Sequence, residues 1–311
     1  MQKAEIIFLV GPTAVGKTET AIHLAKKIDA EIISCDSMQI YQGMDIITAK
    51  PSLALRKKSA QHLIDVVAPT FEYNVFRYRR EALKKIKEII KKGKTPLFAG
   101  GTGLYMSILL DGIFKFRAEN RIIRRRLYKM AEAGGGGYLY KRLQKVDPAS
   151  ALKIHPNDIR RIVRALEVFA ATGKQISQLQ KQRKGLSDEY AVRIFCLNME
   201  RNKLYRRIEK RIDKMFKHGL LREVKGLLKL NLSKTALPAI GIKEMEGYLS
   251  GLYDLEEARR LIKKNTRNYA KRQLTWFRRD KRIEWICLSD REPPASVANR
   301  IYKKLKKTYI I

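Results

Sequence analysis

The sequence predicts an α/β fold, in which helices flank a parallel sheet and an all-helical segment is inserted between two of the strands. Three observations support this prediction. Short apolar runs alternate with helical patterns, a glycine-rich motif joins the first run to the first helix, and residues 115–190 carry helical patterns alone. A chain of 311 residues is long enough for one large domain or two smaller ones.

The expected strands are short apolar runs that are followed by turn residues and then by helical patterns. They are Ile6–Val10, Glu31–Cys35, Leu63–Val67, Pro96–Ala99, Val192–Leu197 and Ile283–Leu288. Such alternation is typical of a parallel sheet covered by helices. We therefore expect a core domain formed by residues 1–114 and 191–311.

The segment 115–190 is expected to be a basic helical insertion in that core. Within it, Gly134–Gly137 is a run of four glycines, which disfavour a helix interior, and it predicts a mobile loop. The chain from Arg201 to Arg282 is again helical and basic.

The glycine-rich motif matches the P-loop pattern at every fixed position. It reads Gly11-Pro12-Thr13-Ala14-Val15-Gly16-Lys17-Thr18 and lies between the first strand and the helical pattern Glu19–Ile28. In such a loop, backbone N–H groups and the lysine bind phosphate oxygens, and the Thr18 hydroxyl is a ligand for Mg²⁺. The motif therefore predicts a bound diphosphate, Mg²⁺ as the cofactor and a P-loop NTPase-like sheet.

The motif does not identify the molecule that carries the diphosphate. ATPases, GTPases and kinases usually add an apolar strand that ends in a Mg²⁺-binding Asp. Asp65 follows only Leu63-Ile64, which weakens this assignment without excluding it.

The net charge points to a polyanionic partner. There are 66 Lys and Arg against 31 Asp and Glu, which gives +35, with a pI near 10.2. Adaptation to heat would raise Lys and Glu together, whereas here only the basic residues are in excess, so nucleic acid is favoured. No apolar run approaches bilayer length, and three scattered cysteines suggest neither a disulfide framework nor a metal site. We expect a reduced, cytoplasmic protein with no membrane partner.

Two polar residues directly follow strands of the expected sheet. Asp36 follows the second strand and Thr102 follows the fourth. Because the carboxyl ends of parallel strands meet at one edge, both residues are expected beside the P-loop.

The segments around these residues closely resemble tRNA dimethylallyltransferases. The matching segments, which follow in order along nearly the whole chain, are Asp36–Ile46, Thr48–Pro51, His62–Asp65, Gly100–Tyr105, Pro238–Glu244 and Asn265–Arg278. This family transfers the dimethylallyl group of dimethylallyl diphosphate to N6 of the adenosine immediately 3′ of the anticodon.

The resemblance implies a role for several residues. It makes Asp36 the general base and Thr102 a contact of the target adenosine. It assigns tRNA contacts to Asp36, Ser37, Met38, Gln39, Thr102, Arg124, Arg160, Arg161, Ile162, Val163 and Arg164. A carboxylate suits this reaction because the adenine amine becomes acidic only as the new C–N bond forms. We further expect Arg211 to stabilise the leaving diphosphate.

The expected helix Asp158–Ala171 is amphipathic. Its apolar face carries Ile159, Ile162, Val163, Leu166 and Phe169, whereas Arg160, Arg161 and Arg164 fall on the other side, where phosphates or exposed bases could be bound. Arg272 is a further candidate phosphate contact. Tyr269, Trp276 and Phe277 have helical spacing and are expected in the core.

Three other assignments remain open from the residues. An isopentenyltransferase acting on free adenine nucleotides would not need the basic insertion. A P-loop ATPase or kinase acting on RNA would turn over ATP. A non-enzymatic RNA-binding module would leave the P-loop and Asp36 unexplained. We expect the chain to act as a monomer on tRNA and dimethylallyl diphosphate.

Overall fold

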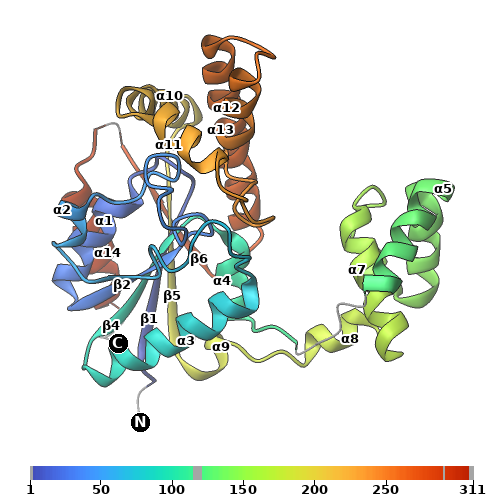
Figure 1. The fold of residues 1–311 in the computed structure, drawn as a ribbon. Coiled ribbons are helices and arrows are strands. Elements are labelled where there is room, and N and C mark those ends of the chain that lie inside the picture. The colour runs from blue at the N-terminus through green and yellow to red at the C-terminus, as the bar shows by residue number, and fades with distance from the viewer. Residues whose placement is uncertain (1–2, 115–120, 290, 308–311) are drawn as a thin grey trace. The chain divides into compact units, whose positions relative to one another are not determined.

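The computed structural model describes residues 3–114, 121–289 and 291–307 (Figure 1). By its internal contacts the chain divides into two compact units, residues 1–109 with 189–311, and residues 110–188. These bounds lie close to the expected 115–190. No described helix combines the length and the apolar composition needed to cross a membrane.

The first unit is built on a six-stranded sheet in which all neighbouring strands run parallel. The strand order is β3-β2-β4-β1-β5-β6. The strands are β1 (Glu5–Val10), β2 (Ala30–Cys35), β3 (Gln61–His62), β4 (Thr95–Gly100), β5 (Ala191–Asn198) and β6 (Ile283–Cys287). The central β1 is an apolar run with buried side chains on both faces, as expected of a strand covered by helices on each side.

Helices cover both faces of this sheet. Helices α1 (Lys17–Lys27) and α14 (Pro294–Lys307) pack together on one face, and α3 (Val75–Lys91) and α4 (Gly103–Leu110) lie on the other (Figure 1). The short α2 is Leu53–Arg56. Beyond the carboxyl ends of the strands lie α10 (Arg201–Lys217), α11 (Leu220–Leu228), α12 (Ile242–Leu249) and α13 (Leu255–Phe277) (Figure 1).

The expected strand at Leu63–Val67 is wrong. Strand β3 ends at His62, and both Leu63 and Asp65 have positive φ angles, which a strand does not allow. The side chains of Leu63 and Val67 are nevertheless buried. The apolar run therefore reflects an irregular segment that contributes to the core.

The second unit is helical. It contains α5 (Arg121–Val146), α6 (Pro148–Ala151), α7 (Ile159–Thr172), α8 (Ile176–Lys181) and the start of α9 (Leu186–Glu189). Its core includes Leu139 and Leu143 of α5 and Ile162, Val163 and Leu166 of α7.

The loop expected at Gly134–Gly137 is also wrong, because α5 continues through all four glycines. Leucines on both sides of the run, Leu127, Leu139 and Leu143, are buried in the helical core. Packing of an apolar face outweighs low helix propensity here, as it commonly does in folded proteins.

Candidate active site

The P-loop lies where β1 ends and α1 begins. Gly11 has a φ of 145°, and a Cβ at this position would lie 2.6 Å from the carbonyl oxygen of Leu197. Gly16 is left-handed and immediately precedes α1, which starts at Lys17. The loop therefore needs Gly11 in order to pass close to β5, and Gly16 provides the left-handed turn that leads into α1.

Lys17 is held within this loop. Its Nζ donates hydrogen bonds to the carbonyl oxygens of Gly11 at 2.9 Å and of Pro12 at 2.7 Å. Burial lowers the pKa of Lys17 to about 8, with a further lowering by the charge of Arg211, while the Asp36 carboxylate opposes both. An anion bound beside Lys17 would stabilise its charged form.

Asp36 and Thr102 lie close together because β2 and β4 are neighbouring strands, with Cys35 opposite Gly100. A Cβ at Gly100 would come within 2.1 Å of the Cys35 carbonyl oxygen, so this close approach requires glycine. The Asp36 carboxylate accepts a hydrogen bond from the backbone N–H of Met38 at 2.9 Å. The Thr102 hydroxyl accepts one from the N–H of Ser37 at 3.0 Å, and therefore positions the turn that carries Asp36.

A cavity of about 560 Å³ opens beside the P-loop and Asp36. Most of its lining comes from four segments, namely Thr13, Ala14 and Gly16–Glu19 of the P-loop and α1, Asp36 with Gln39, the stretch Thr48–Pro51, and Arg207, Lys210, Arg211 and Lys214 of α10. Leu55, Ala99, Gly100 and Tyr269 complete it. The cavity therefore brings together two carboxylates, those of Glu19 and Asp36, the phosphate-binding loop and a set of cations.

Arg211 lies in this cavity, as expected. Its guanidinium donates a hydrogen bond of 2.5 Å to the hydroxyl of Thr13. Burial lowers the pKa of Arg211, and the Asp36 carboxylate acts in the opposite direction. The Nε atom is buried and has no hydrogen-bond partner among the described residues. A buried donor of this kind is suited to bind an anion.

Two residues of α13 at this site differ from expectation, since the role of Gln273 was not foreseen and Tyr269 was expected in the core. The side chain of Gln273 accepts a hydrogen bond from the N–H of Thr13 and donates one to the carbonyl oxygen of Gly101, both at 2.9 Å. It thereby joins the P-loop to the turn before Thr102. Tyr269 lines the cavity instead of lying in the core, and burial first, then the Asp36 charge, raise its pKa. Phe277 is buried as expected.

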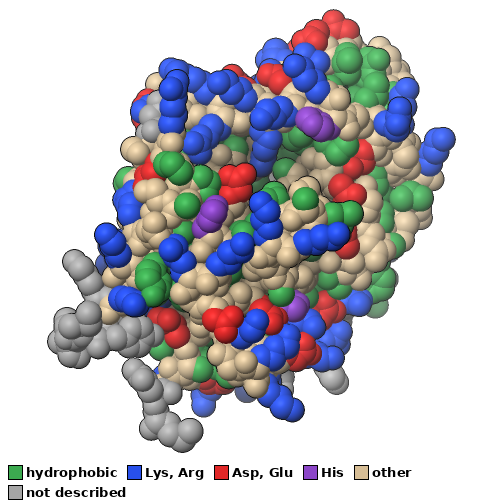
Figure 2. Space-filling model, turned by 90° about the vertical axis from the view of Figure 1, so that its left-hand side faces the viewer, with side chains coloured by type: hydrophobic (Ala, Val, Ile, Leu, Met, Phe, Trp, Pro, Cys, Tyr) green, Lys and Arg blue, Asp and Glu red, His purple; other side chains and the backbone are tan. Residues whose placement is uncertain are grey.

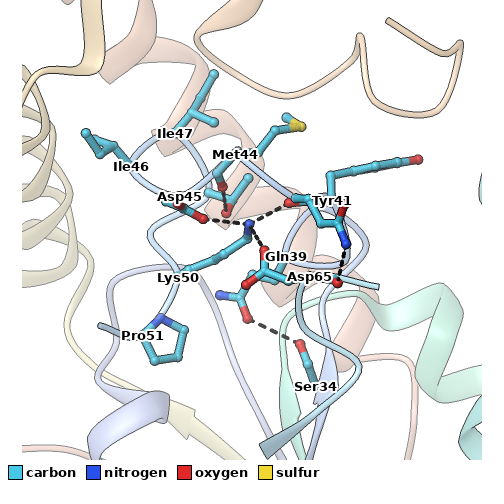
Figure 3. A network of polar contacts seen from close by, with 12 residues as sticks. Ser34, Gln39, Tyr41, Met44, Asp45, Ile46, Ile47, Lys50, Pro51 and Asp65 are labelled. Carbon is cyan, nitrogen blue, oxygen red and sulfur yellow. Dashed lines mark hydrogen bonds and ion pairs between the residues drawn. The ribbon is translucent and has the colours of Figure 1, made fainter. Parts of the chain in front are cut away.

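A network of polar contacts fixes the stretch Met44–Pro51 (Figure 3). The buried ammonium of Lys50 donates hydrogen bonds to the Tyr41 carbonyl oxygen, to Asp45 at 2.8 Å and to Asp65 at 2.5 Å. Burial alone would raise the pKa of Asp65, but hydrogen bonds from Lys50 and Arg56 outweigh it and hold that pKa low. The Asp65 carboxylate is thus occupied by two cations rather than offered to a metal.

Glu223 of α11 also fixes this stretch, through hydrogen bonds to its backbone. Its carboxylate accepts hydrogen bonds from three consecutive backbone N–H groups, those of Asp45 at 3.0 Å and of Ile46 and Ile47 at 2.8 Å. The cavity wall at Thr48–Pro51 is therefore held by Lys50 from within and by the fixed residues Asp45–Ile47 that precede it.

The remaining residues expected near the cavity lie on the turn after β2 or on α13. Ser37, Met38 and Gln39 are half-buried, and Gln39 accepts a hydrogen bond from Ser34 at 3.2 Å. Arg272 is exposed, with its guanidinium 5.8 Å from the Tyr269 ring centre.

In the helical unit, the expected tRNA-contact residues fall into three groups. Ile162 and Val163 have buried side chains that belong to the core, so neither side chain can reach RNA. Arg124 and Arg164 both donate to the fully buried carboxylate of Glu167, each at 2.9 Å. Arg164 is therefore not a free residue of the outer face, contrary to expectation.

Arg160 and Arg161 form the third group, because both are exposed. Arg161 makes an ion pair with Asp158 at 3.3 Å, across which solvent screening is strong. These two residues are the part of the expected basic face that α7 offers to a partner.

Two family models match the chain. The IPP transferase model matches residues 39–280, and the Isopentenyl transferase model matches residues 4–64. Among curated proteins, the tRNA dimethylallyltransferase of Halothermothrix orenii is 45% identical over 97% of this chain and 92% of its own length. That of Thermotoga maritima is 44% identical over 98% of both chains.

Solved structures of tRNA-prenylating transferases are also similar to this chain. The full-length tRNA isopentenylpyrophosphate transferase of Bacillus halodurans is 38% identical, with a TM-score of 0.72 over 99% of this chain and 98% of that one. A eukaryotic dimethylallyltransferase acting on tRNA is 29% identical, with a TM-score of 0.80 over 99% of this chain and 79% of that one.

Proposed function

The chain belongs to the IPP transferase family of tRNA dimethylallyltransferases, and on that premise we propose that it prenylates N6 of the adenosine next to the anticodon of tRNA. The donor is dimethylallyl diphosphate, and the products are N6-isopentenyladenosine and diphosphate. The observation that supports this best is the single cavity that holds the P-loop, Asp36 and Arg211 together.

The reaction joins the exocyclic N6 of adenine to C1 of the dimethylallyl group, and the C1–O bond to the diphosphate breaks. The N6 proton becomes acidic as the C–N bond forms, and the carboxylate of Asp36 accepts it. Negative charge gathers on the departing diphosphate, where Lys17, the P-loop N–H groups and Arg211 stabilise it. The target adenine must leave its stack to reach this cavity.

The cofactor is Mg²⁺, with Thr18 as its ligand from the chain. The described residues contain no cluster of three or more His, Cys, Asp or Glu side chains suited to hold a metal. This fits Mg²⁺, which usually binds through one or two protein oxygens together with substrate phosphates and waters. When bound, Mg²⁺ neutralises charge on the diphosphate.

The helical unit binds the anticodon stem-loop, and its net positive charge supports this role. An enzyme for free adenine nucleotides has no use for such a unit. An NTPase is disfavoured because Asp65, the candidate for its Mg²⁺-binding carboxylate, is bound by Lys50 and Arg56. We further propose that the chain acts as a monomer. The expected compartment is the cytoplasm, because the substrate is tRNA.

The test is to incubate an unmodified anticodon stem-loop with dimethylallyl diphosphate, Mg²⁺ and the enzyme, and to measure the mass of the RNA. A stem-loop with guanosine in place of the target adenosine is the matched control. We expect one prenyl group on the adenosine-containing RNA alone, without ATP. Hydrolysis of ATP with no change in RNA mass would contradict the proposal.

A further inference from the structure

Helix α10 presents a row of cations to the cavity. Arg207, Lys210, Arg211 and Lys214 are spaced three and four residues apart, so they share one face of the helix, and all four line the cavity with the P-loop. On the face of the molecule that Figure 2 shows, Lys and Arg side chains gather over the upper part. Arg211 is the member already placed beside Thr13.

The acidic residues of α10 point elsewhere. Glu209 forms an ion pair with Arg267, and Asp213 forms one with Lys263 at 2.7 Å. Both partners belong to α13. Glu209 and Asp213 follow Arg207 and Arg211 by two residues, a rotation of about 200° around the helix. The helix therefore directs its carboxylates to α13 and its cations to the cavity.

No carboxylate of the described residues lies within ion-pair distance of Arg207, Lys210 or Lys214. Lys210 and Lys214 are exposed, and Arg207 is half-buried, with a guanidinium nitrogen 3.4 Å from the Val15 carbonyl oxygen. Their charges thus add to the field at the P-loop without local neutralisation. The cavity lining carries six cations, Lys17, Lys50, Arg207, Lys210, Arg211 and Lys214, against the two carboxylates of Glu19 and Asp36. A cleft in which one sign of charge predominates concentrates ligands of the opposite sign and speeds their association.

We infer that Arg207, Lys210 and Lys214 form an access route that draws the donor's diphosphate to the P-loop. The inference rests on the proposed function, because that function supplies the diphosphate. The exposed lysines attract the anion, Arg207 holds it near Val15 and Gly16, and Arg211 and Lys17 receive it. The row serves diphosphate rather than the RNA backbone, because it shares one cavity with the P-loop.

The test is the double variant Lys210→Gln/Lys214→Gln, which removes two charges at exposed positions and keeps good helix formers. The matched control is Arg206→Gln/Lys217→Gln, which removes two exposed charges from the same helix outside the cavity lining. Kinetics are measured for the donor and for the stem-loop at about 20 mM and about 500 mM salt, since screening shortens the reach of charges. Binding of Mg²⁺–pyrophosphate is measured by calorimetry.

We expect kcat/KM for the donor to fall about five- to tenfold in the test variant at low salt and less than about twofold at high salt. The control and the KM for RNA should change less than about twofold. Weaker pyrophosphate binding in the test variant alone would support the route even if no prenyl transfer occurred, which separates it from the proposed function. Unchanged pyrophosphate affinity, or a loss confined to RNA binding, would overturn it.

Discussion

Helices α7 and α10 have the same kind of sequence, since each is amphipathic with basic residues on the face away from its apolar stripe. Their cations nevertheless meet different partners. In α7, Arg164 joins Arg124 on the buried carboxylate of Glu167. In α10, Arg207, Lys210 and Lys214 have no acidic partner among the described residues and line a cavity.

A basic helix face is available to a partner only where nearby acidic residues do not already pair with its cations. The carboxylate of Glu167 lies inside the core and takes an arginine from each of two helices, whereas Glu209 and Asp213 are used by α13. The cations left for a partner are thus Arg160 with Arg161 on α7, and a row beside the P-loop on α10. We therefore propose that α7 contributes to RNA binding and α10 to donor binding.

The largest effect is expected at Asp36, which lines the same cavity as the cations of α10. In Asp36→Ala, kcat should fall by about 10²–10⁴-fold, because the proton acceptor of the transition state is lost. The affinity for the stem-loop should stay within a few-fold of wild type. Single-turnover rates and RNA titration measure the two quantities, and a near-normal rate would remove Asp36 from the mechanism.

The pH dependence of donor use follows from Lys17. Its pKa in the free enzyme is about 8, lowered by burial, so the ammonium is charged below that pH and loses its proton above it. We expect kcat/KM for the donor to be level below pH 8 and to fall about tenfold per unit above it. A profile that stays level to pH 9.5 would show that the charge of Lys17 is not needed.

A stability effect is expected on the α7 side. Arg124 and Arg164 both form ion pairs with the buried carboxylate of Glu167, and Arg164→Gln removes one of the two. The free energy of unfolding should therefore fall by about 1–3 kcal/mol. Arg160→Gln is the matched control on the same helix and should change stability by less than about 0.5 kcal/mol. Denaturant unfolding compares them, and equal midpoints would contradict the structural role of Arg164.

The smallest effect concerns α5, which supplies Arg124. A Cβ added at Gly137 would have no heavy atom within 4 Å, whereas one added at Gly134 would lie 3.1 Å from the Cβ of Tyr138. Gly137→Ala should therefore stabilise the protein by about 0.5–1 kcal/mol, and Gly134→Ala should gain less. Thermal unfolding tests this, and no gain at Gly137 would argue against a continuous helix.

The sequence predicted what depends on local residues. The parallel sheet follows from the alternation of apolar runs with helical patterns, and the P-loop and the position of Asp36 follow from short motifs at the ends of those runs. The segment Leu63–Val67 was misassigned because buried apolar residues such as Leu63 and Val67 are also typical of a strand. The positive φ angles of Leu63 and Asp65, which exclude a strand, could not be predicted from the sequence.

Contacts between distant residues could not be predicted. Gln273 forms a hydrogen bond with Thr13, which lies 260 residues earlier in the sequence. The sequence pattern of the 23-residue helix α13 does not indicate which of its polar side chains points toward the P-loop. The pairing of Arg164 with Glu167, three residues further along the same helix, was missed for a different reason, because an acidic residue on a helix is usually exposed.

The most direct test of the division between α7 and α10 is the salt dependence of stem-loop affinity in two double variants, Arg160→Gln/Arg161→Gln and Lys210→Gln/Lys214→Gln. Each cation that neutralises a phosphate contributes a slope of about −0.7 for single strands and −0.9 for duplex. We predict that the α7 variant loses about one to two units of slope while its donor KM is unchanged, and that the α10 variant keeps the wild-type slope. An unchanged slope and affinity in the α7 variant, with the loss in the α10 variant, would contradict the division.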